Sequence, residues 1–449
     1  MTPRLSANLT WGAAALLALV ILGLLTRNIL AIPAHVPLDP NEGWNAAHAL
    51  AAMAGHGLYP PSQALMVNNY PPLSFYLIGA LARHGDVIVT GRWACLVAYL
   101  AAVAGIAVLL QRMDCRPGAI VLGALFFAAL LLITSDYVGM DDPQLPGHAV
   151  QIAALLLVLR DRIMIAAALF AVSLFIKHNL LALPLAAGLW LLLQDRRAGV
   201  HFLLWGMAFA LSGLVLFQLT FGTSLLAQLA SPRLSSLANV GSAVAHLWWA
   251  PLPAIAMAGF WPDRHSLFCS LYAGLALVLG LIFAAGDGVD ANAFFDLGIA
   301  LSLALGLVVD RGRWPILAAA SALPLLVFLA ATFQDNNFFF TRAFAQSSAR
   351  DIGFLNGRNG PALCDQLSLC LWAGKGAAVD VFNIGEAIKA GARDPRPLAQ
   401  MIADHRFATL QLIDMDGLGP DVRRAIEKNY RADHSDDNGA FLVPVTRAP

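Results

Sequence analysis

The stretch FIKHN, residues 175–179, lies at the junction of two apolar runs, IMIAAALFAVSLFI (163–176) and LLALPLAAGLWLLL (180–193). A single helix over 163–193 would be about 46 Å long, too long for a hydrocarbon core of about 30 Å. As a hairpin, each arm is about 22 Å long. Its tip, with Lys177, His178 and Asn179, is then expected just below the outer membrane surface. A buried ammonium there needs an anion or a path to water.

The composition predicts a polytopic α-helical membrane protein. Hydrophobic residues make up 59% of the 449 residues and charged residues 12%, whereas soluble proteins average about 25% charged residues. The net charge is zero, so no basic face predicts binding to nucleic acid. About eleven apolar runs have spanning or near-spanning length. They lie at 11–32, 87–111, 118–136, 146–159, 163–177, 179–193, 200–221, 243–260, 266–284, 294–309 and 314–332.

The arginines predict the orientation of these spans. The short loops on one side contain Arg112, Arg116, Arg160, Arg162, Arg196, Arg197, Arg264, Arg311 and Arg313. The opposite short loops contain almost no basic residue, so the positive-inside rule makes the arginine-rich side cytoplasmic. The N-terminus is then cytoplasmic. We expect a transmembrane domain over 1–333, with a first periplasmic loop at 33–86, and a periplasmic domain over 334–449.

Two polar regions are predicted to fold outside the membrane. In the first loop, a helix over 42–55 along the membrane surface is expected, capped by Asn41. The C-terminal region is typical of a small α/β domain. Its expected strands are 361–364, 377–381, 407–413 and 440–444, and its expected helices are 366–373, 397–404 and 420–429. Cys364 and Cys370 are compatible with a disulfide in an oxidising compartment, but their spacing does not fix the Cα distance and leaves free thiols as the alternative.

Polar residues expected at the outer membrane surface are the candidates for function. The first loop contains Asp39 and Glu42 in PLDPNEGWNAAHA (37–49), followed by NNYPPLSFY (68–76). The third span is followed by Asp141 and Asp142, in SDYVGMDDPQLPGH (135–148). Another outer segment, GDGVDANAFFD (286–296), contains Asn292. Together with the hairpin tip, these segments predict a cavity mouth rich in carboxylates.

These segments, in this order, carry a resemblance. The set NEGWNAAHALAAMAGHGLYP (41–60), NNYPPLSFY, a lysine in a hairpin and DANAFFD (290–296), with many spans and an outer α/β domain, resembles the GT-C glycosyltransferases. It is most similar to the bacterial, family 39-like branch allied to protein O-mannosyltransferases and the lipid A aminoarabinose transferase. The resemblance covers most of the chain. It implies an inverting enzyme of the bacterial inner membrane that moves a sugar from a polyprenyl phosphate to an acceptor hydroxyl at the periplasmic face.

The resemblance also implies roles for individual residues. An acceptor hydroxyl needs a carboxylate to take its proton. Glu42 matches the family's glutamate, whereas Asn41 stands where the family's aspartate falls, so Asp39 is the alternative base and Glu42 is favoured. The departing phosphate needs positive charge or hydrogen-bond donors, which predicts Lys177, His178 and Arg233 as its partners. The further expected substrate-binding residues are Asn69, Tyr70, Asp141, Asp142 and Asn292.

Other interpretations of the same residues remain open. Glu42 could serve only as a helix cap, and Lys177 only as a snorkelling anchor. A divalent cation could bind between the carboxylates, but no ligand spacing requires one and no other cofactor is indicated. A transporter or flippase of lipid-linked sugar would also have charges along a membrane pathway. An inactive GT-C-like binding subunit is a third alternative, because the family's aspartate is missing. The acceptor could be a lipid, a glycan or a protein.

Overall fold

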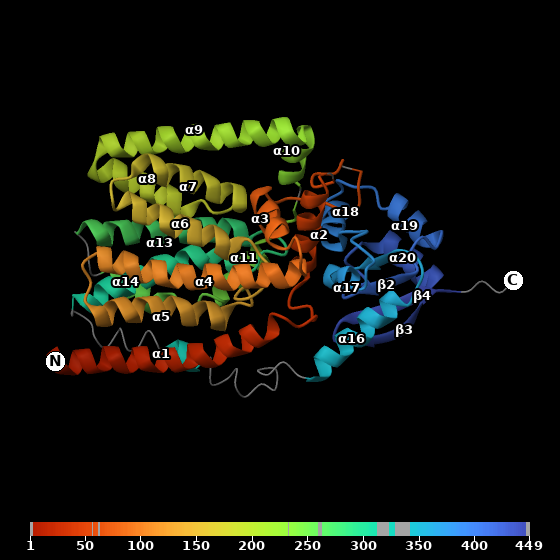
Figure 1. The fold of residues 1–449 in the computed structure, drawn as a ribbon, viewed down its shortest axis with the longest axis horizontal. Coiled ribbons are helices and arrows are strands. Elements are labelled where there is room, and N and C mark those ends of the chain that lie inside the picture. Colours follow the sequence, from red (N-terminus) through yellow and green to blue (C-terminus); the bar gives the residue numbers. More distant parts are fainter. Residues whose placement is uncertain are drawn as a thin grey trace.

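The computed structural model describes residues 3–55, 57–61, 63–231, 233–258, 263–311, 323–327 and 342–445. Long helices run roughly parallel to one another and form a bundle, and the C-terminal domain covers one end of it (Figure 1). We call this end of the bundle the covered end. The segments between the long helices that reach it are 32–86, 135–143, 177–181, 222–236 and 285–294, apart from residues 56, 62 and 232, which the structure does not describe.

Most of the predicted spans are confirmed as apolar helices. Six helices are long and apolar enough to cross a membrane, and three shorter apolar helices accompany them within the described residues. The long ones are α1 (Pro3–Ala31), α4 (Val87–Arg112), α5 (Pro117–Thr134), α9 (Arg196–Phe221), α13 (Arg264–Ala284), and α14 (Phe295–Asp310) with the preceding 3-10 turn η1 (Ala291–Phe294). The shorter ones are α6 (Gln144–Val158), α7 (Ile163–Ile176) and α8 (Ala182–Gln194).

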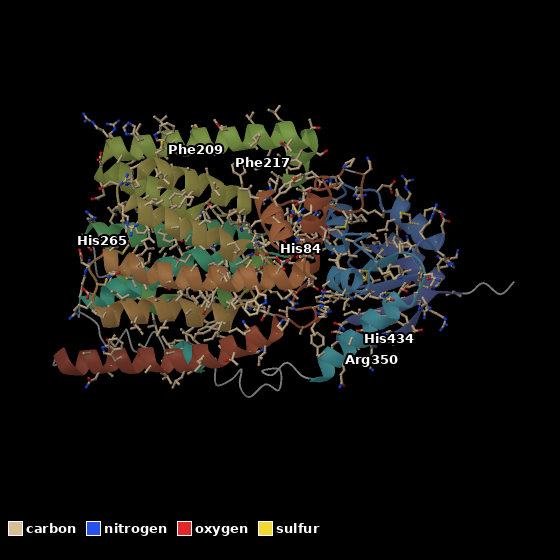
Figure 2. All side chains as sticks on the ribbon, viewed as in Figure 1. His84, Phe209, Phe217, His265, Arg350 and His434 are labelled. Carbon is tan, nitrogen blue, oxygen red and sulfur yellow. A yellow bond between two sulfur atoms is a disulfide. The ribbon has the colours of Figure 1, made fainter. Side chains whose placement is uncertain are left out.

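The helices of the bundle differ in how much they are buried by other helices. α14 packs against α5 and α13, and its residues are buried over nearly its whole length. In α9, by contrast, only Gly199 and Phe202 are buried. Figure 2 shows α9 at the edge of the bundle, where Phe209 and Phe217 are labelled. An apolar helix with apolar side chains left exposed on this scale suits contact with lipid.

The hairpin predicted from FIKHN is confirmed. α7 ends at Ile176 and α8 begins at Ala182, while Lys177 has an extended backbone with φ −150°. The two arms do not form one continuous helix, and both pack against α9. α7 also packs against α6, and α8 against α13. The tip of the hairpin therefore lies at the covered end.

The predicted span 243–260 is wrong. Its described part consists of α11 (Leu237–Ala245) and α12 (Pro251–Ala258), which are separated by a turn over 246–250. Pro251 explains the break, because proline suits the first turn of a helix but disfavours helical backbone in the residue before it. The predicted span 314–332 lies outside the described residues except for 323–327.

The first loop forms two helices, α2 (Pro40–Ala54) and α3 (Leu73–Leu81). The helix predicted over 42–55 is confirmed, but its expected cap is wrong. Asp39 has extended backbone and its Oδ1 accepts a hydrogen bond of 2.7 Å from the backbone N–H of Asn41. Pro40 occupies the first helical position, which suits its fixed φ and missing N–H.

The C-terminal domain has a four-stranded sheet in the order β1-β2-β4-β3, with β1 parallel to β2 and the other pairs antiparallel. Its strands are β1 (Ala362–Cys364), β2 (Thr409–Leu412), β3 (Tyr430–Asp436) and β4 (Gly439–Pro444). Its helices are α16 (Arg342–Asn356), α17 (Leu367–Trp372), α18 (Val381–Lys389), α19 (Arg396–Ala403) and α20 (Pro420–Asn429). The three predicted helices and three of the four predicted strands correspond to these elements.

Two errors in the predicted α/β domain have simple causes. The segment 377–381 is not a strand but leads into α18, whose first turn is capped by Asp380. β3 was missed because its sequence YRADHSD is mostly polar, as befits a strand at the edge of the sheet with exposed side chains. The predicted domain boundary between 333 and 334 lies outside the described residues.

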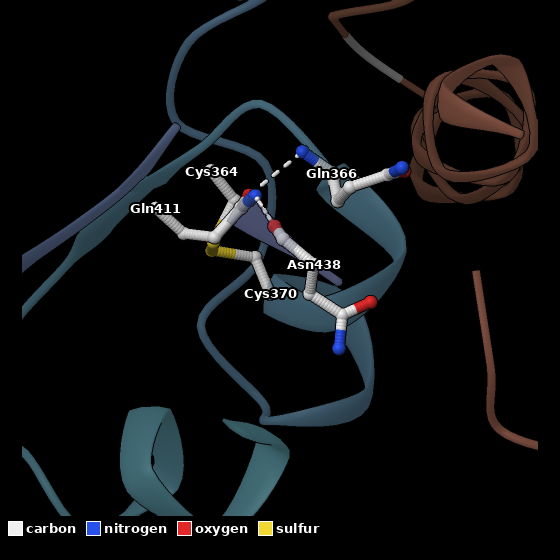
Figure 3. Close-up of a disulfide and its surroundings, with 5 residues drawn as sticks. All are labelled: Cys364, Gln366, Cys370, Gln411 and Asn438. Carbon is white, nitrogen blue, oxygen red and sulfur yellow. Dashed lines mark hydrogen bonds between the residues drawn. A yellow bond between two sulfur atoms is a disulfide. The ribbon is translucent and has the colours of Figure 1, made fainter. Parts of the chain in front are cut away.

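Cys364 and Cys370 form a disulfide that joins the end of β1 to α17 (Figure 3). The Gln411 side chain lies beside the disulfide and forms hydrogen bonds to the backbone of two segments, at Gln366 and at Asn438. Its Oε1 accepts a hydrogen bond of 2.8 Å from the backbone N–H of Gln366, and its Nε2 donates one of 2.6 Å to the carbonyl of Asn438. The disulfide and this amide together hold α17, which is the helix that contacts α2.

Candidate functional site

The first loop and the C-terminal domain are joined by buried hydrogen bonds. The indole N–H of Trp44 donates to Asp380 Oδ2 at 2.9 Å, and the backbone N–H of Asp380 donates to the carbonyl of Leu65 at 2.8 Å. Gly43 allows the close approach of α17, because a Cβ there would lie 2.1 Å from the backbone nitrogen of Ser368. Burial raises the pKa of Asp380 to about 6, against the hydrogen bonds that it accepts. The first loop and the C-terminal domain therefore together cover this end of the helix bundle, and we call this cover the roof.

A cavity of about 330 Å³ lies beneath this roof at the covered end. Its walls come from the first loop, the hairpin tip, the segment 229–235, the connection between α13 and α14, and the start of α18. Six of the predicted site residues line it together: Asn69, Tyr70, Lys177, His178, Arg233 and Asn292. Segments far apart in the sequence thus meet in one cavity.

Lys177 has an anionic partner. Its Nζ lies 2.8 Å from Asp142 Oδ1 and 3.1 Å from Oδ2, and it stands 4.7 Å from the centroid of the Tyr70 ring. Both side chains of the ion pair are almost completely buried. The lysine is therefore not a snorkelling anchor exposed to water. Asp142 does not line the cavity itself but neutralises the lysine that does.

Arg233 is the second cation of the cavity. It is exposed and its guanidinium carbon lies 5.7 Å from the centroid of the Phe382 ring, a residue of α18. Within the described residues it forms no ion pair. An anion that enters the cavity can therefore contact Arg233 without displacing a carboxylate.

Glu42 is not at the cavity. Its carboxylate is completely buried in a two-point ion pair with Arg92, at 2.7 Å from Nε to Oε1 and 2.6 Å from Nη2 to Oε2. The backbone N–H groups of Leu38 and Asp141 donate to the same two oxygens, at 3.1 and 3.2 Å. Contrary to its expected role as base, Glu42 has no oxygen that an acceptor in the cavity could reach.

Arg92 was missed by the sequence analysis. Beyond Glu42, its guanidinium donates to the carbonyls of Ala31, Ile32, Ala34 and Val36. It thus fixes the end of α1 and the start of the first loop against α4. The sequence does contain an indication of this role: Arg92 lies inside the predicted span 87–111, and an arginine within a span needs a partner.

Asp39 is the more accessible of the two candidate bases. It is half-buried and does not line the cavity itself, but it caps the backbone N–H of Asn41, which does. Burial raises the pKa of Asp39 to about 6, because the loss of water and the repulsion from Asp142 outweigh the hydrogen bond from the Asn41 N–H. A carboxyl group with such a pKa is ionised at neutral pH but is a stronger base than an ordinary aspartate.

Asp141 lines another pocket, of about 20 Å³, together with Asn45, Ser74 and Asp142, the partner of Lys177. The carboxylate lies against Gly91, where a Cβ would be 2.0 Å from Oδ1. Burial, together with repulsion from Glu42 and Asp142, raises the pKa of Asp141 well above its usual range. Asp141 therefore does not line the cavity that Lys177 lines, and Asp142 lies between the two.

The cavity also contains residues that the sequence analysis did not single out: Asn41, Trp44, Tyr137, Asn179, Phe382 and Asn383. Asn179 could have been found, since it is part of FIKHN. Asn383 could not, because it reaches the cavity only through docking of the C-terminal domain.

A cluster with metal-ligand chemistry occurs elsewhere in the described chain. The ligand atoms of Asp351, His434 and Asp436 lie within 4.8 Å of one another. This cluster is in the C-terminal domain, where Figure 2 labels His434, and none of its members lines the cavity. No comparable group was found among the described carboxylates near the cavity.

No protein-family model matches the sequence, and no curated protein matches it. The fold does match solved structures. ArnT from Cupriavidus metallidurans in the apo state superimposes with a TM-score of 0.63 at 12% identity, over 96% of this chain and 98% of that chain. The same protein bound to undecaprenyl phosphate gives a TM-score of 0.61 at 13% identity over the same shares. The chain therefore has the fold of ArnT over nearly its whole length, including the C-terminal α/β domain.

Proposed function

We propose that this protein is an inverting glycosyltransferase that moves a sugar from a polyprenyl phosphate to an acceptor hydroxyl at the periplasmic face of the bacterial inner membrane. The observation that carries the proposal is the cavity at the covered end, which joins two cations, aromatic rings and amides. The shared fold supports it, because one of the matching ArnT structures is bound to undecaprenyl phosphate.

Arg233 and Lys177 bind the phosphate of the donor in this proposal. As the bond between the anomeric carbon and the phosphate oxygen breaks, the electron pair leaves with the phosphate. Positive charge fixed beside that oxygen stabilises the developing charge. Arg233 forms no ion pair with any described residue, so we assign it the larger share. The ammonium of Lys177, which is already paired with Asp142, contributes the smaller share.

Asp39 takes the proton of the acceptor hydroxyl as that oxygen attacks the anomeric carbon from the opposite face. This assignment reverses the preference for Glu42, whose oxygens are all used by Arg92 and backbone N–H groups. Glu42 instead positions α2, and with it the cap residue Asp39, against α4.

The test is binding and turnover with purified full-length protein. A panel of polyprenyl-phosphate sugars is supplied with membrane lipids as acceptors, and release of polyprenyl phosphate is measured. We expect at least one donor to bind and turn over, and Arg233→Gln to weaken its binding about tenfold or more. Arg197→Gln, an arginine at the opposite end of the bundle, is the matched control.

Two results would contradict the proposal. One is the absence of binding for every polyprenyl-phosphate sugar at concentrations that saturate ordinary membrane glycosyltransferases. The other is transfer of the intact lipid-linked sugar between the two leaflets of a vesicle without cleavage of the phosphate bond, which would identify a flippase.

A further inference from the structure

The wall of the cavity is rich in neutral amides and free of carboxylates. Among the described residues that line it there is no aspartate or glutamate. Apart from Lys177, His178 and Arg233, its hydrogen-bonding side chains are amides, hydroxyls and one indole. They belong to Asn41, Asn69, Asn179, Asn292, Asn383, Ser231, Ser235, Tyr70, Tyr137 and Trp44. An amide offers both donors and acceptors, so this wall matches the hydroxyl groups of a sugar.

Two amides of this wall differ in their hydrogen bonding: Asn383 is held in place by its neighbours, whereas Asn179 has an acceptor available for a sugar. Asn383 Nδ2 donates to the buried Asp380 at 2.7 Å, and Asn383 Oδ1 accepts a longer hydrogen bond of 3.4 Å from Asn69. On the hairpin side, the buried Oδ1 of Asn179 has no hydrogen-bond partner among the described residues. An unpaired buried acceptor is costly, and a sugar hydroxyl could satisfy it.

The charges of the cavity are unfavourable for a cationic ligand. Arg233 stands at the wall and forms no ion pair with any described residue, whereas Lys177 is paired with Asp142. A protonated amino group on the sugar would enter a site that contains the unpaired charge of Arg233 and the paired ammonium of Lys177. It would find no lining carboxylate to compensate the loss of its hydration.

Building on the proposed function, we infer that the sugar carried by the donor is uncharged and rich in hydroxyls, and that the cavity discriminates against amino sugars. The amide wall formed jointly by the first loop, the hairpin tip and α18 binds the sugar ring. Arg233 and Lys177 bind the phosphate next to it. The C-terminal domain thereby takes part in donor selection through Asn383 and Phe382.

Matched donor pairs test this inference. Polyprenyl phosphates that carry arabinose or glucose are compared with their 4-amino-4-deoxy counterparts, in competition with a labelled polyprenyl phosphate and, where turnover occurs, in transfer. The full-length protein is expected to bind the hydroxyl member of each pair at least tenfold more tightly. Equal or tighter binding of the amino sugars would overturn the inference.

A gain-of-function variant makes the test independent of a simple loss of folding. Asn69→Asp adds a carboxylate to the wall with little change in shape, and it should shift the preference toward the amino sugars by about tenfold. Asn8→Asp, in the part of α1 remote from the covered end, is the matched control and should leave the preference unchanged. An Asn69→Asp protein that binds donor but keeps the wild-type preference would count against the inference.

The two proposals fail in different ways. If no member of either pair binds, the proposed glycosyltransferase function falls and this inference falls with it. If the amino members bind and are transferred in preference to the hydroxyl members, the function stands and only the neutral-sugar inference is overturned.

Discussion

The carboxylate of Glu42 and the guanidinium of Arg92 face each other as a fully buried, two-point ion pair, with N–O distances of 2.6 and 2.7 Å. The pair joins α2 of the first loop to α4 of the bundle. A buried pair of this kind depends on both members, because removal of one leaves the other charged and without water. Glu42 also accepts a hydrogen bond from the backbone N–H of Leu38, next to Asp39, so the pair supports the proposed site.

Glu42→Gln is therefore expected to act on stability. Loss of the anion beside Arg92 should lower the free energy of unfolding by about 3 kcal/mol or more, measured as a fall in the thermal unfolding midpoint of the detergent-purified protein. A double variant, Glu42→Gln with Arg92→Met, should recover part of that loss.

A surface ion pair provides the control for Glu42→Gln. Arg116 and Asp310 form a pair with side-chain exposures of 71% and 21%, and Arg116→Gln should change stability by about 1 kcal/mol or less. If Glu42→Gln left the unfolding midpoint unchanged but abolished transfer, Glu42 would be the base after all.

Asp39→Asn separates the base from the helix cap. Asparagine keeps an oxygen that can accept the Asn41 N–H, so α2 should remain capped. Transfer should fall by about 10²-fold or more, the range for loss of a general base, with little change in donor binding. Asp195→Asn, at the cap of α9, should leave both unchanged. Near wild-type turnover by Asp39→Asn would exclude this residue as base.

The pH dependence of transfer gives an independent check on Asp39. A base acts in its deprotonated form, and the pKa of Asp39 is raised to about 6. The rate should therefore rise with pH through about 6 and level off above it. An ordinary aspartate would complete this rise two pH units lower, near its usual pKa of about 4. A rate independent of pH between 5 and 7 in the chemical step would contradict the assignment.

Substitutions of Lys177 distinguish charge from shape. Lys177→Ala removes the partner of Asp142 and should weaken donor binding more than Lys177→Arg, which keeps a positive charge near Tyr70. Because Lys177→Ala leaves a buried carboxylate, the double variant Lys177→Met with Asp142→Asn removes the ion pair as a unit. This variant should fold better than Lys177→Ala yet still bind donor poorly. Normal donor binding by it would show that the lysine serves the structure only.

The disulfide should stabilise the roof of the cavity. Its loop is short, with a sequence separation of 6 residues, so the chain-entropy model predicts a loss of about 2 kcal/mol for the double variant Cys364→Ala with Cys370→Ala. The measurement is the unfolding midpoint of the full chain with and without reductant. A midpoint that responds equally to reductant in the variant and in the wild type would show that the effect arises elsewhere.

Much of the architecture follows from local sequence patterns. Run length and arginine placement predicted most of the helices and the hairpin, because the thickness of the membrane limits the length of a span. They failed at 243–260, where Pro251 interrupts an apolar run. In the C-terminal domain the buried strands were found by their apolar residues, whereas the polar edge strand β3 was not.

The sequence by itself determined the fold class, the hairpin tip at Lys177 and the segments that meet at the covered end. Only the tertiary structure decided which carboxylate can act there. Asp39 and Glu42 are three residues apart, and no local pattern shows that Arg92, 50 residues after Glu42, occupies the glutamate's oxygens. The same holds for Asn383, which reaches Asn69 across 314 residues. Which side chains reach a cavity, and which charges surround it, depend on contacts between distant segments. The burial that shifts the pKa of a carboxyl group exists only after those segments have packed together.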